Sequence, residues 1–316
     1  MTPATGIAFQ LLQSLFVVLV APLLTGWVNQ CRAWLQNRAA PPLLLPYYML
    51  AKLFHKDAVI ARSASPLFRL TPYILFGCMW LAAGIVPVLA TALPFAPAAD
   101  IIALVGVFAL ARVFSALAAM DIGTSFGGLG ARREMLIGFL AEPAMLMTLF
   151  TAAFIAGSTQ LTTIVNTLAH REFAVYPSLA FAAVAFLMVL LAENARIPID
   201  NPTTHLELTM VHEAMILEYS ARHLALIEWA AAIKLFAYMT IGIALFLPWG
   251  IAAAGNWAGL PLALAALGLK LACAGAGLAL LETVLAKLRL FLAPEFLSAA
   301  FLLAVLGMLL HFLVLN

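Results

Sequence analysis

The chain has 316 residues, of which 65% are hydrophobic and 9% are charged. Soluble domains carry roughly 25% charged residues, and a water-soluble fold of this length has too little interior for so many apolar side chains. The composition therefore predicts a membrane protein, and the formal net charge of +2 gives no indication of nucleic-acid binding.

Hydropathy predicts an all-α, polytopic fold of about eight transmembrane helices in a single domain covering residues 1–316, because each apolar segment has the ~20 residues that cross a hydrocarbon core. The first segment has no basic residue before it and no cleavage site after it, which favours a retained helix over a signal peptide. We expect the spans near residues 7–28, 70–93, 100–119, 135–156, 176–192, 227–248, 258–281 and 296–314.

Most of the 16 lysine and arginine residues lie in the loops after the first, third, fifth and seventh spans. By the positive-inside rule these loops face the cytoplasm and both termini face outward. We expect extended cytoplasmic loops with amphipathic helices at residues 29–69 and 193–226. In the first loop, PPLLLPYYMLAKLFHKD predicts an amphipathic helix that either rests on lipid headgroups or docks a partner. The residues expected to face water are Lys52, His55, Lys56 and Asp57.

The loop after the third span contains AAMDIGTSFGGLGARREM, residues 118–135. Its glycines allow positive φ angles or close approach to another chain. A nucleotide-binding loop would follow a strand, and a membrane helix is predicted here instead. The segment is therefore either a tight turn or a surface on which Asp121, Arg132, Arg133 and Glu134 dock a partner.

Ionisable residues also occur within the predicted spans or at their ends, where an unpaired charge costs ~2.5 to more than 10 kcal/mol. Such charges on different helices either form salt bridges that hold the helices in register or form a coupled chain along which a proton or ion moves. Their number favours the coupled chain. These residues are Arg112, Glu142, Lys234, Lys270 and Glu282.

Acidic residues gather in AENARIPIDNPTTHLELTMVHEAMILEYSARHLALIEW, residues 192–229. Pro198 and Pro202 interrupt a continuous helix, and the capping-box pattern from Thr204 to Glu207 predicts a new helix that runs to about Ala221. On that helix Glu207 and Glu218 share one stripe. They face either an internal cavity or a basic partner such as Arg196 or Arg222. The acids are Glu193, Asp200, Glu207, Glu213, Glu218 and Glu228.

Histidines and cysteines do not predict a metal site in this chain. His205, His212 and His223 lack a zinc-binding spacing. The three cysteines are far apart without a CxxC pair, which excludes a disulfide framework and suggests apolar packing residues.

Two long segments resemble a known family: ALARVFSALAAMDIGTSFGGLGARREMLIGFLAEPAML and ENARIPIDNPTTHLELTMVHEAMILEYS. They resemble the membrane subunit of group 4 membrane-bound NiFe hydrogenases, the family of formate hydrogenlyase subunit 4 and hydrogenase-4 component C. This family is similar to the quinone-site membrane subunit of respiratory complex I. The stretch KLFHKD…FRLTPY fits the family's first cytoplasmic loop, so the resemblance covers nearly the whole chain.

The resemblance implies a multi-pass subunit of a bacterial or archaeal cytoplasmic membrane, non-catalytic alone, that couples electron transfer to proton or sodium movement. It implies hydrogenase large and small subunits, a ferredoxin-like Fe–S subunit and antiporter-like subunits as partners, which would hold the NiFe centre and the Fe–S clusters. The functional positions of the family that match this sequence are the charged loop after the fifth span, the motif that closes this loop and the acidic residue of the fourth span. Lys234 and Lys270 would belong to the family's row of charged residues within the membrane, called the charged axis. The loop and motif residues are Glu193, Arg196, Asp200, Glu207 and Glu218, and the acid is Glu142.

Two alternatives remain open. The chain could be the quinone-site subunit of an NADH–quinone oxidoreductase, although Thr203, Thr204 and His205 stand where that enzyme has an acidic run, which favours the hydrogenase branch. It could also be a stand-alone ion-coupled transporter, but the sequence lacks the internal repeat on which many transporter folds are built.

Overall fold

A computed structural model describes residues 3–87, 100–170, 177–200, 210–251, 259–286, 288 and 292–315. The named elements in these ranges are all helices. They are α1 (Pro3–Leu35), α2 (Leu45–Phe54), α3 (Pro66–Ile85), α4 (Ile101–Asp121), α5 (Ser125–Ala156), α6 (Leu161–His170), α7 (Pro177–Glu193), α8 (His212–Ile216), α9 (Ala221–Phe246), α10 (Leu260–Val284) and α11 (Ala293–Leu315).

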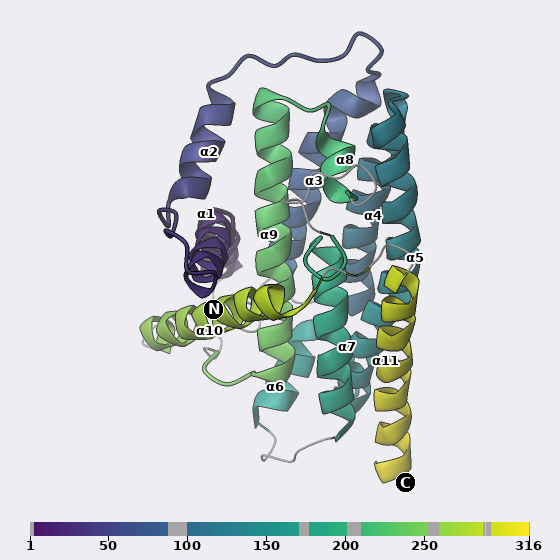
Figure 1. Cartoon of the computed structure of the whole chain (residues 1–316). Helices are drawn as coiled ribbons and strands as arrows, with labels where there is room; N and C mark the ends of the chain where they lie inside the picture. The colour runs from purple at the N-terminus through teal and green to yellow at the C-terminus, as the bar shows by residue number, and fades with distance from the viewer. Residues whose placement is uncertain are drawn as a thin grey trace.

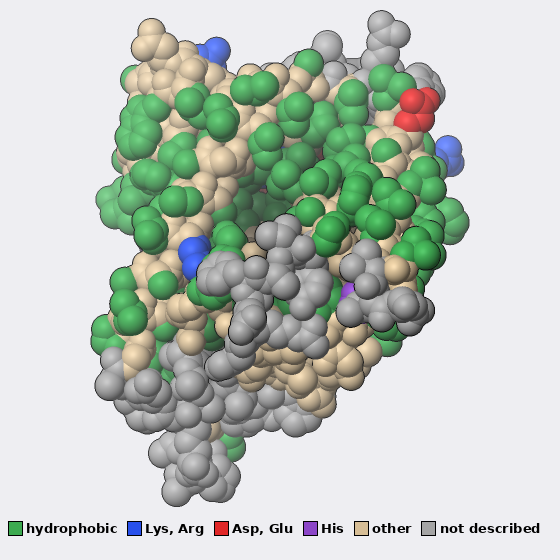
Figure 2. All heavy atoms as spheres, turned by 90° about the horizontal axis from the view of Figure 1, so that it is seen from below, with side chains coloured by type: hydrophobic (Ala, Val, Ile, Leu, Met, Phe, Trp, Pro, Cys, Tyr) green, Lys and Arg blue, Asp and Glu red, His purple; other side chains and the backbone are tan. Residues whose placement is uncertain are grey.

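Seven of the described helices are long and apolar enough to cross a membrane, and the shorter apolar helix α7 corresponds to the predicted fifth span. The prediction of an all-α multi-pass membrane protein is therefore confirmed, while the outward orientation of the termini stays a prediction. In Figure 1, α3, α4, α5, α7, α9 and α11 run alongside one another, α10 runs across them, and α1 is seen almost along its axis. Figure 2, which looks at the molecule from below, shows many hydrophobic and few charged side chains on the described surface.

Short polar side chains fix the starts of the central helices. The Ser65 hydroxyl accepts a hydrogen bond from the Leu67 amide (3.1 Å) before α3. The Asp100 carboxylate accepts one from the Ile102 amide (2.7 Å) before α4. These caps satisfy amide groups that have no partner within the helix.

Segment 118–135 contains a turn, as one of its two interpretations predicted, but its SFGGLG part is helical. It forms the first turns of α5, and the turn lies earlier, at Gly123, with a φ of 76°. A Cβ on Gly127 would lie 2.4 Å from the Ala119 carbonyl oxygen, and one on Gly130 would lie 2.9 Å from that of Val211. These glycines therefore let α5 approach α4 and the segment before α8, within this chain.

The helix predicted from Thr204 to about Ala221 is wrong at its C-terminal end and at Met210 and Val211, which are not helical. Residues 201–209, which include His205 and Glu207, lie outside the described residues, and the described helix α8 ends at Ile216. The Tyr219 ring stacks on Phe68 at 3.9 Å, and its hydroxyl donates to the Phe68 carbonyl (3.0 Å). Burial raises the pKa of Tyr219, which keeps that donor protonated. This buried anchor turns the chain before α9, and Glu218 is exposed in the turn.

The predicted helix of the first loop is confirmed as α2. It packs against α9 and α1, and Leu50 is its buried residue. Lys52 on α2 is exposed, as are His55, Lys56 and Asp57 directly after it, and so are Tyr48 and Met49. Both ends of the predicted loop at residues 29–69 are helical, because α1 continues to Leu35 and α3 begins at Pro66.

Candidate functional site

A buried arginine on α4 holds carboxylates from two other helices together. The Arg112 guanidinium donates to Glu142 on α5 and to Glu193 at the end of α7. Its Nε lies 3.6 Å from Oε1 of Glu134, also on α5. A guanidinium suits this position because its five N–H donors lie in one plane and reach several acceptors at once.

Gly138 provides the space for this arginine. A Cβ at that position would lie 2.4 Å from Nη1 and 2.8 Å from Cζ of Arg112. Gly138 precedes Glu142 by four residues, so the gap and the carboxylate lie on the same face of α5. Sequence reasoning missed Gly138, and the i, i+4 spacing to an acid within a span is the signal that it overlooked.

Glu193 is shared by two cations from different helices. Besides the Arg112 contact, its Oε2 lies 3.0 Å from Nζ of Lys234 on α9, and its side chain is 1% exposed. The ring of Tyr238, one turn further along α9 and fully buried, has its centroid 5.9 Å from the same Nζ. Tyr238 is a second residue that the sequence did not single out, because a tyrosine in an apolar helix carries no charge signal.

A second ion-pair cluster lies on the other side of the α7 terminus. Glu282 of α10, with 1% of its side chain exposed, pairs with Arg196 (3.1 Å) and with Arg32 of α1 (3.4 Å). Because Arg196 follows Glu193 by three residues, one short segment joins both clusters. The charged network, defined here as Arg32, Arg112, Glu134, Glu142, Glu193, Arg196, Lys234 and Glu282, thus draws on α1, α4, α5, α7, α9 and α10.

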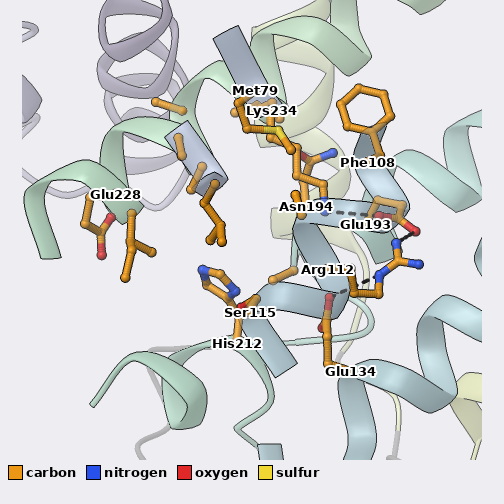
Figure 3. Close-up of a pocket in the computed structure, with 18 of the residues that line it drawn as sticks. Met79, Phe108, Arg112, Ser115, Glu134, Glu193, Asn194, His212, Glu228 and Lys234 are labelled. Atoms are coloured by element: carbon orange, nitrogen blue, oxygen red, sulfur yellow. Dashed lines mark hydrogen bonds and ion pairs between the residues drawn. The ribbon is translucent and has the colours of Figure 1, made fainter. Parts of the chain in front are cut away.

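A cavity of about 180 Å³ adjoins the network, which is room for several water molecules. Figure 3 shows Arg112 and Lys234 converging on Glu193, with His212 between this group and Glu228. Much of the remaining wall is apolar, although Thr25, Ser115 and Asn194 also line it. It includes Leu75, Met79, Phe108, Ile227 and Leu235. The cavity therefore combines a charged side with an apolar side, within helices that span the membrane.

Other predicted coupling residues lie apart from the network. Asp200 accepts from the amides of Val211 (3.3 Å) and His212 (3.1 Å) and so fixes the start of α8. Lys270 donates to the Leu247 carbonyl (2.6 Å) and to that of Trp249, at the end of α9.

The remaining acids of the loop after α7 do not join the network either. Glu213 lies on α8 and Glu218 in the turn after it, and neither forms an ion pair with another described residue. Glu207 lies outside the described residues, so its predicted position facing the cavity stays a prediction.

The predicted docking residues mostly contact this chain. Asp121 accepts from the Ser65 amide (2.8 Å), and Arg133 donates to the Met210 carbonyl (2.9 Å). Glu134 belongs to the network through Arg112, while Arg132 is exposed. A docking role for these residues stays a prediction.

A sequence model of the NADH dehydrogenase family matches residues 8–313. The chain belongs to that family. It is 33% identical over 296 residues to formate hydrogenlyase subunit 4 of Escherichia coli (strain K12), covering 94% of this chain and 95% of that protein. It is 36% identical over 245 residues to hydrogenase-4 component C of the same organism, covering 77% and 76%. The resemblance found in the sequence is thereby confirmed.

The fold is also similar to a chain of an archaeal respiratory membrane complex, the membrane-bound sulfane sulfur reductase. The TM-score is 0.79 at 17% identity, covering 96% of this chain and 99% of that one. The two Escherichia coli relatives are thus named as a subunit and a component of larger assemblies, and the structural neighbour is a chain of a membrane complex.

Proposed function

We propose that this chain is the integral membrane subunit of a hydrogenase or formate hydrogenlyase complex in the cytoplasmic membrane of a bacterium or archaeon. In this role it anchors a peripheral arm and couples the electron transfer of that arm to the movement of protons or sodium ions. The observation that carries the proposal is Glu193, a buried carboxylate shared by Arg112 and Lys234 beside a cavity within the spans.

The charge count around Glu193 supports proton exchange. Glu134, Glu142 and Glu193 face two cations, so full ionisation leaves one negative charge in excess. A proton resolves that excess by neutralising one of the three carboxylates. Two unit charges 4 Å apart interact by about 4 kcal/mol at an effective dielectric constant of 20, so protonation of one carboxylate strongly changes the affinity of its neighbours for protons.

The second cluster extends this exchange along the molecule. Arg196 follows Glu193 by three residues and shares Glu282 with Arg32. We infer that a change of charge at Glu193 is transmitted through this short segment to the ion pairs with α1 and α10. Opposite charges on separate membrane helices are the usual construction of proton and ion routes.

The proposed partners are hydrogenase large and small subunits, a ferredoxin-like Fe–S subunit and antiporter-like membrane subunits. The NiFe centre and the Fe–S clusters would belong to those partners. Exposed Arg132 at the start of α5 is available to such a partner. Purification of the complex through a tag on this chain, followed by mass spectrometry of the bound proteins, tests this assignment directly.

Glu193→Gln tests the coupling role. It keeps the shape of the side chain and removes the charge that Arg112 and Lys234 share. The matched control is Glu295→Gln, which removes an exposed carboxylate at the start of α11. In inverted membrane vesicles supplied with the donor that the purified complex accepts, we expect Glu193→Gln to lower the number of ions moved per hydrogen molecule, with the control unchanged. Normal ion movement and normal hydrogen evolution in Glu193→Gln would refute the proposal.

A second candidate is the quinone-site subunit of an NADH–quinone oxidoreductase. The family match and the apolar wall of the cavity, with Met79 and Phe108, favour it, because a lipid quinone has an apolar body and polar ring oxygens. The same purification separates the two candidates. A complex without a hydrogenase large subunit that reduces a short-chain quinone would support this second function.

A further inference from the structure

Two helices display matching rows of side chains that begin with an arginine and continue with aromatic or apolar residues. On α3 the row is Arg69, Tyr73, Phe76 and Trp80, at spacings of four, three and four residues that keep one helix face. On α9 the corresponding row is Arg222, Leu226 and Trp229. Neither row belongs to the charged network.

Ring contacts join the two rows to each other. Phe76 and Trp229 have ring centroids 5.3 Å apart, and the Tyr73 ring meets His223 of α9 at 5.9 Å. Phe54 of α2 meets Trp229 at 6.3 Å. We call Phe54, Tyr73, Phe76, Trp80 and Trp229 the aromatic stripe.

The aromatic stripe is open to the surroundings of the protein. The exposed fractions of Tyr73 and Trp80 are 48% and 42%, and that of Phe54 is 44%. An aromatic surface of this kind is favourable against lipid and unfavourable against water. The stripe therefore needs an apolar occupant.

A group of cations lies at one end of the stripe. Arg69 and Arg222 are exposed in the first turns of α3 and α9, and the ring contact between Tyr73 and His223 joins these two helices. Figure 1 places the starts of α3 and α9 and the C-terminal end of α2, which carries Lys52, at the same upper end of the molecule. Among the described residues, neither arginine forms an ion pair with a carboxylate, exposed Asp57 and Glu218 included.

We propose that the aromatic stripe and its two arginines bind an anionic phospholipid. The phosphate contacts Arg69 and Arg222, because guanidinium groups bind phosphate oxygens through paired N–H donors. An acyl chain lies along the rings toward Trp80. The rise from Arg69 to Trp80 is about 16 Å, which matches one half of a ~30 Å hydrocarbon core. The positive-inside pattern predicts that this end faces the cytoplasmic leaflet, where acidic lipids attract basic residues.

A photoreactive residue at the apolar end of the aromatic stripe identifies the lipid bound there by crosslinking to it. Trp80 is replaced by p-benzoylphenylalanine, another aromatic residue, in the complex purified through this chain. The complex is reconstituted in vesicles with equal amounts of phosphatidylglycerol and phosphatidylethanolamine that have identical acyl chains. Mass spectrometry after illumination identifies the adduct. We expect phosphatidylglycerol adducts to predominate.

Arginine variants test the phosphate contact. Arg69→Gln and Arg222→Gln should each lower the ratio of phosphatidylglycerol to phosphatidylethanolamine adducts by about fivefold. Arg38→Gln is the matched control, since Arg38 is an exposed arginine in the segment between α1 and α2 and does not belong to either row. It should leave the ratio unchanged.

Three results would overturn the proposal. Equal amounts of the two adducts in the complex that carries only the Trp80 replacement would show that the stripe does not select an anionic headgroup. Adducts with another subunit would show that the stripe is a protein interface. Loss of the preference in excess inorganic phosphate would show that the arginines bind a free anion. Because no residue of the stripe belongs to the charged network, each result leaves the proposed coupling role unaffected.

Discussion

Gly138→Ala is expected to destabilise the protein although alanine is the better helix former. The added Cβ would lie 2.4 to 2.8 Å from Nη1, Cδ and Cζ of Arg112, so the whole guanidinium group must move. Breaking a buried ion pair costs about 3–5 kcal/mol, and replacing glycine by alanine in a helix returns about 1 kcal/mol. The expected net loss of unfolding free energy is therefore about 2–4 kcal/mol.

Gly106→Ala is the matched control, because Gly106 lies on α4, the helix of Arg112, and a Cβ there meets no atom within 4 Å. It should raise the stability slightly. The assay is an SDS titration of the purified protein in one detergent, with the folded fraction followed by tryptophan fluorescence. In an Arg112→Met background, Gly138→Ala should no longer lower the unfolding free energy, because the guanidinium group that the added Cβ would meet is absent. If Gly138→Ala and Gly106→Ala had equal stability, the packing of Arg112 against Gly138 would be refuted.

Two further predictions concern single charges. Glu142→Ala should lower the unfolding free energy by about 1–3 kcal/mol more than Glu142→Gln, because alanine leaves a donor of Arg112 without an acceptor. Equal midpoints in the SDS titration would contradict this reasoning. Lys270→Met should cost about 1–3 kcal/mol through its lost hydrogen bonds at the end of α9, with unchanged ion movement per hydrogen molecule in vesicles. A coupling defect in Lys270→Met would instead place Lys270 in the charged axis.

The membrane spans could be predicted because each depends on a long apolar segment, a property of composition alone. The sequence also identified Arg112, Glu142, Lys234 and Glu282 as charges that require partners in lipid, and all four form ion pairs. What it could not supply was which charges meet. Lys234 and Lys270 both lie between apolar residues, but one reaches Glu193 and the other reaches backbone carbonyls.

Local patterns left open what packing decides. The glycines of SFGGLG allowed either a turn or a close approach, and close helix contacts explain Gly127 and Gly130 within α5. The capping-box pattern suggested a helix to about Ala221, but the stacking of Tyr219 on Phe68 ends it earlier. Both outcomes depend on contacts between segments far apart in the chain, which no local window of sequence contains.

The length of α7 bears on how deep Glu193 lies in the membrane. Its 17 residues rise about 25 Å, which is less than the ~30 Å of a typical hydrocarbon core. The end of this described helix would lie nearer the opposite face of the membrane than the corresponding end of α9, which has 26 residues. In the proposed coupling role, a proton that moves between Glu193 and the opposite side would cross much of the membrane voltage, which is worth about 2.3 kcal/mol per 100 mV for the full drop.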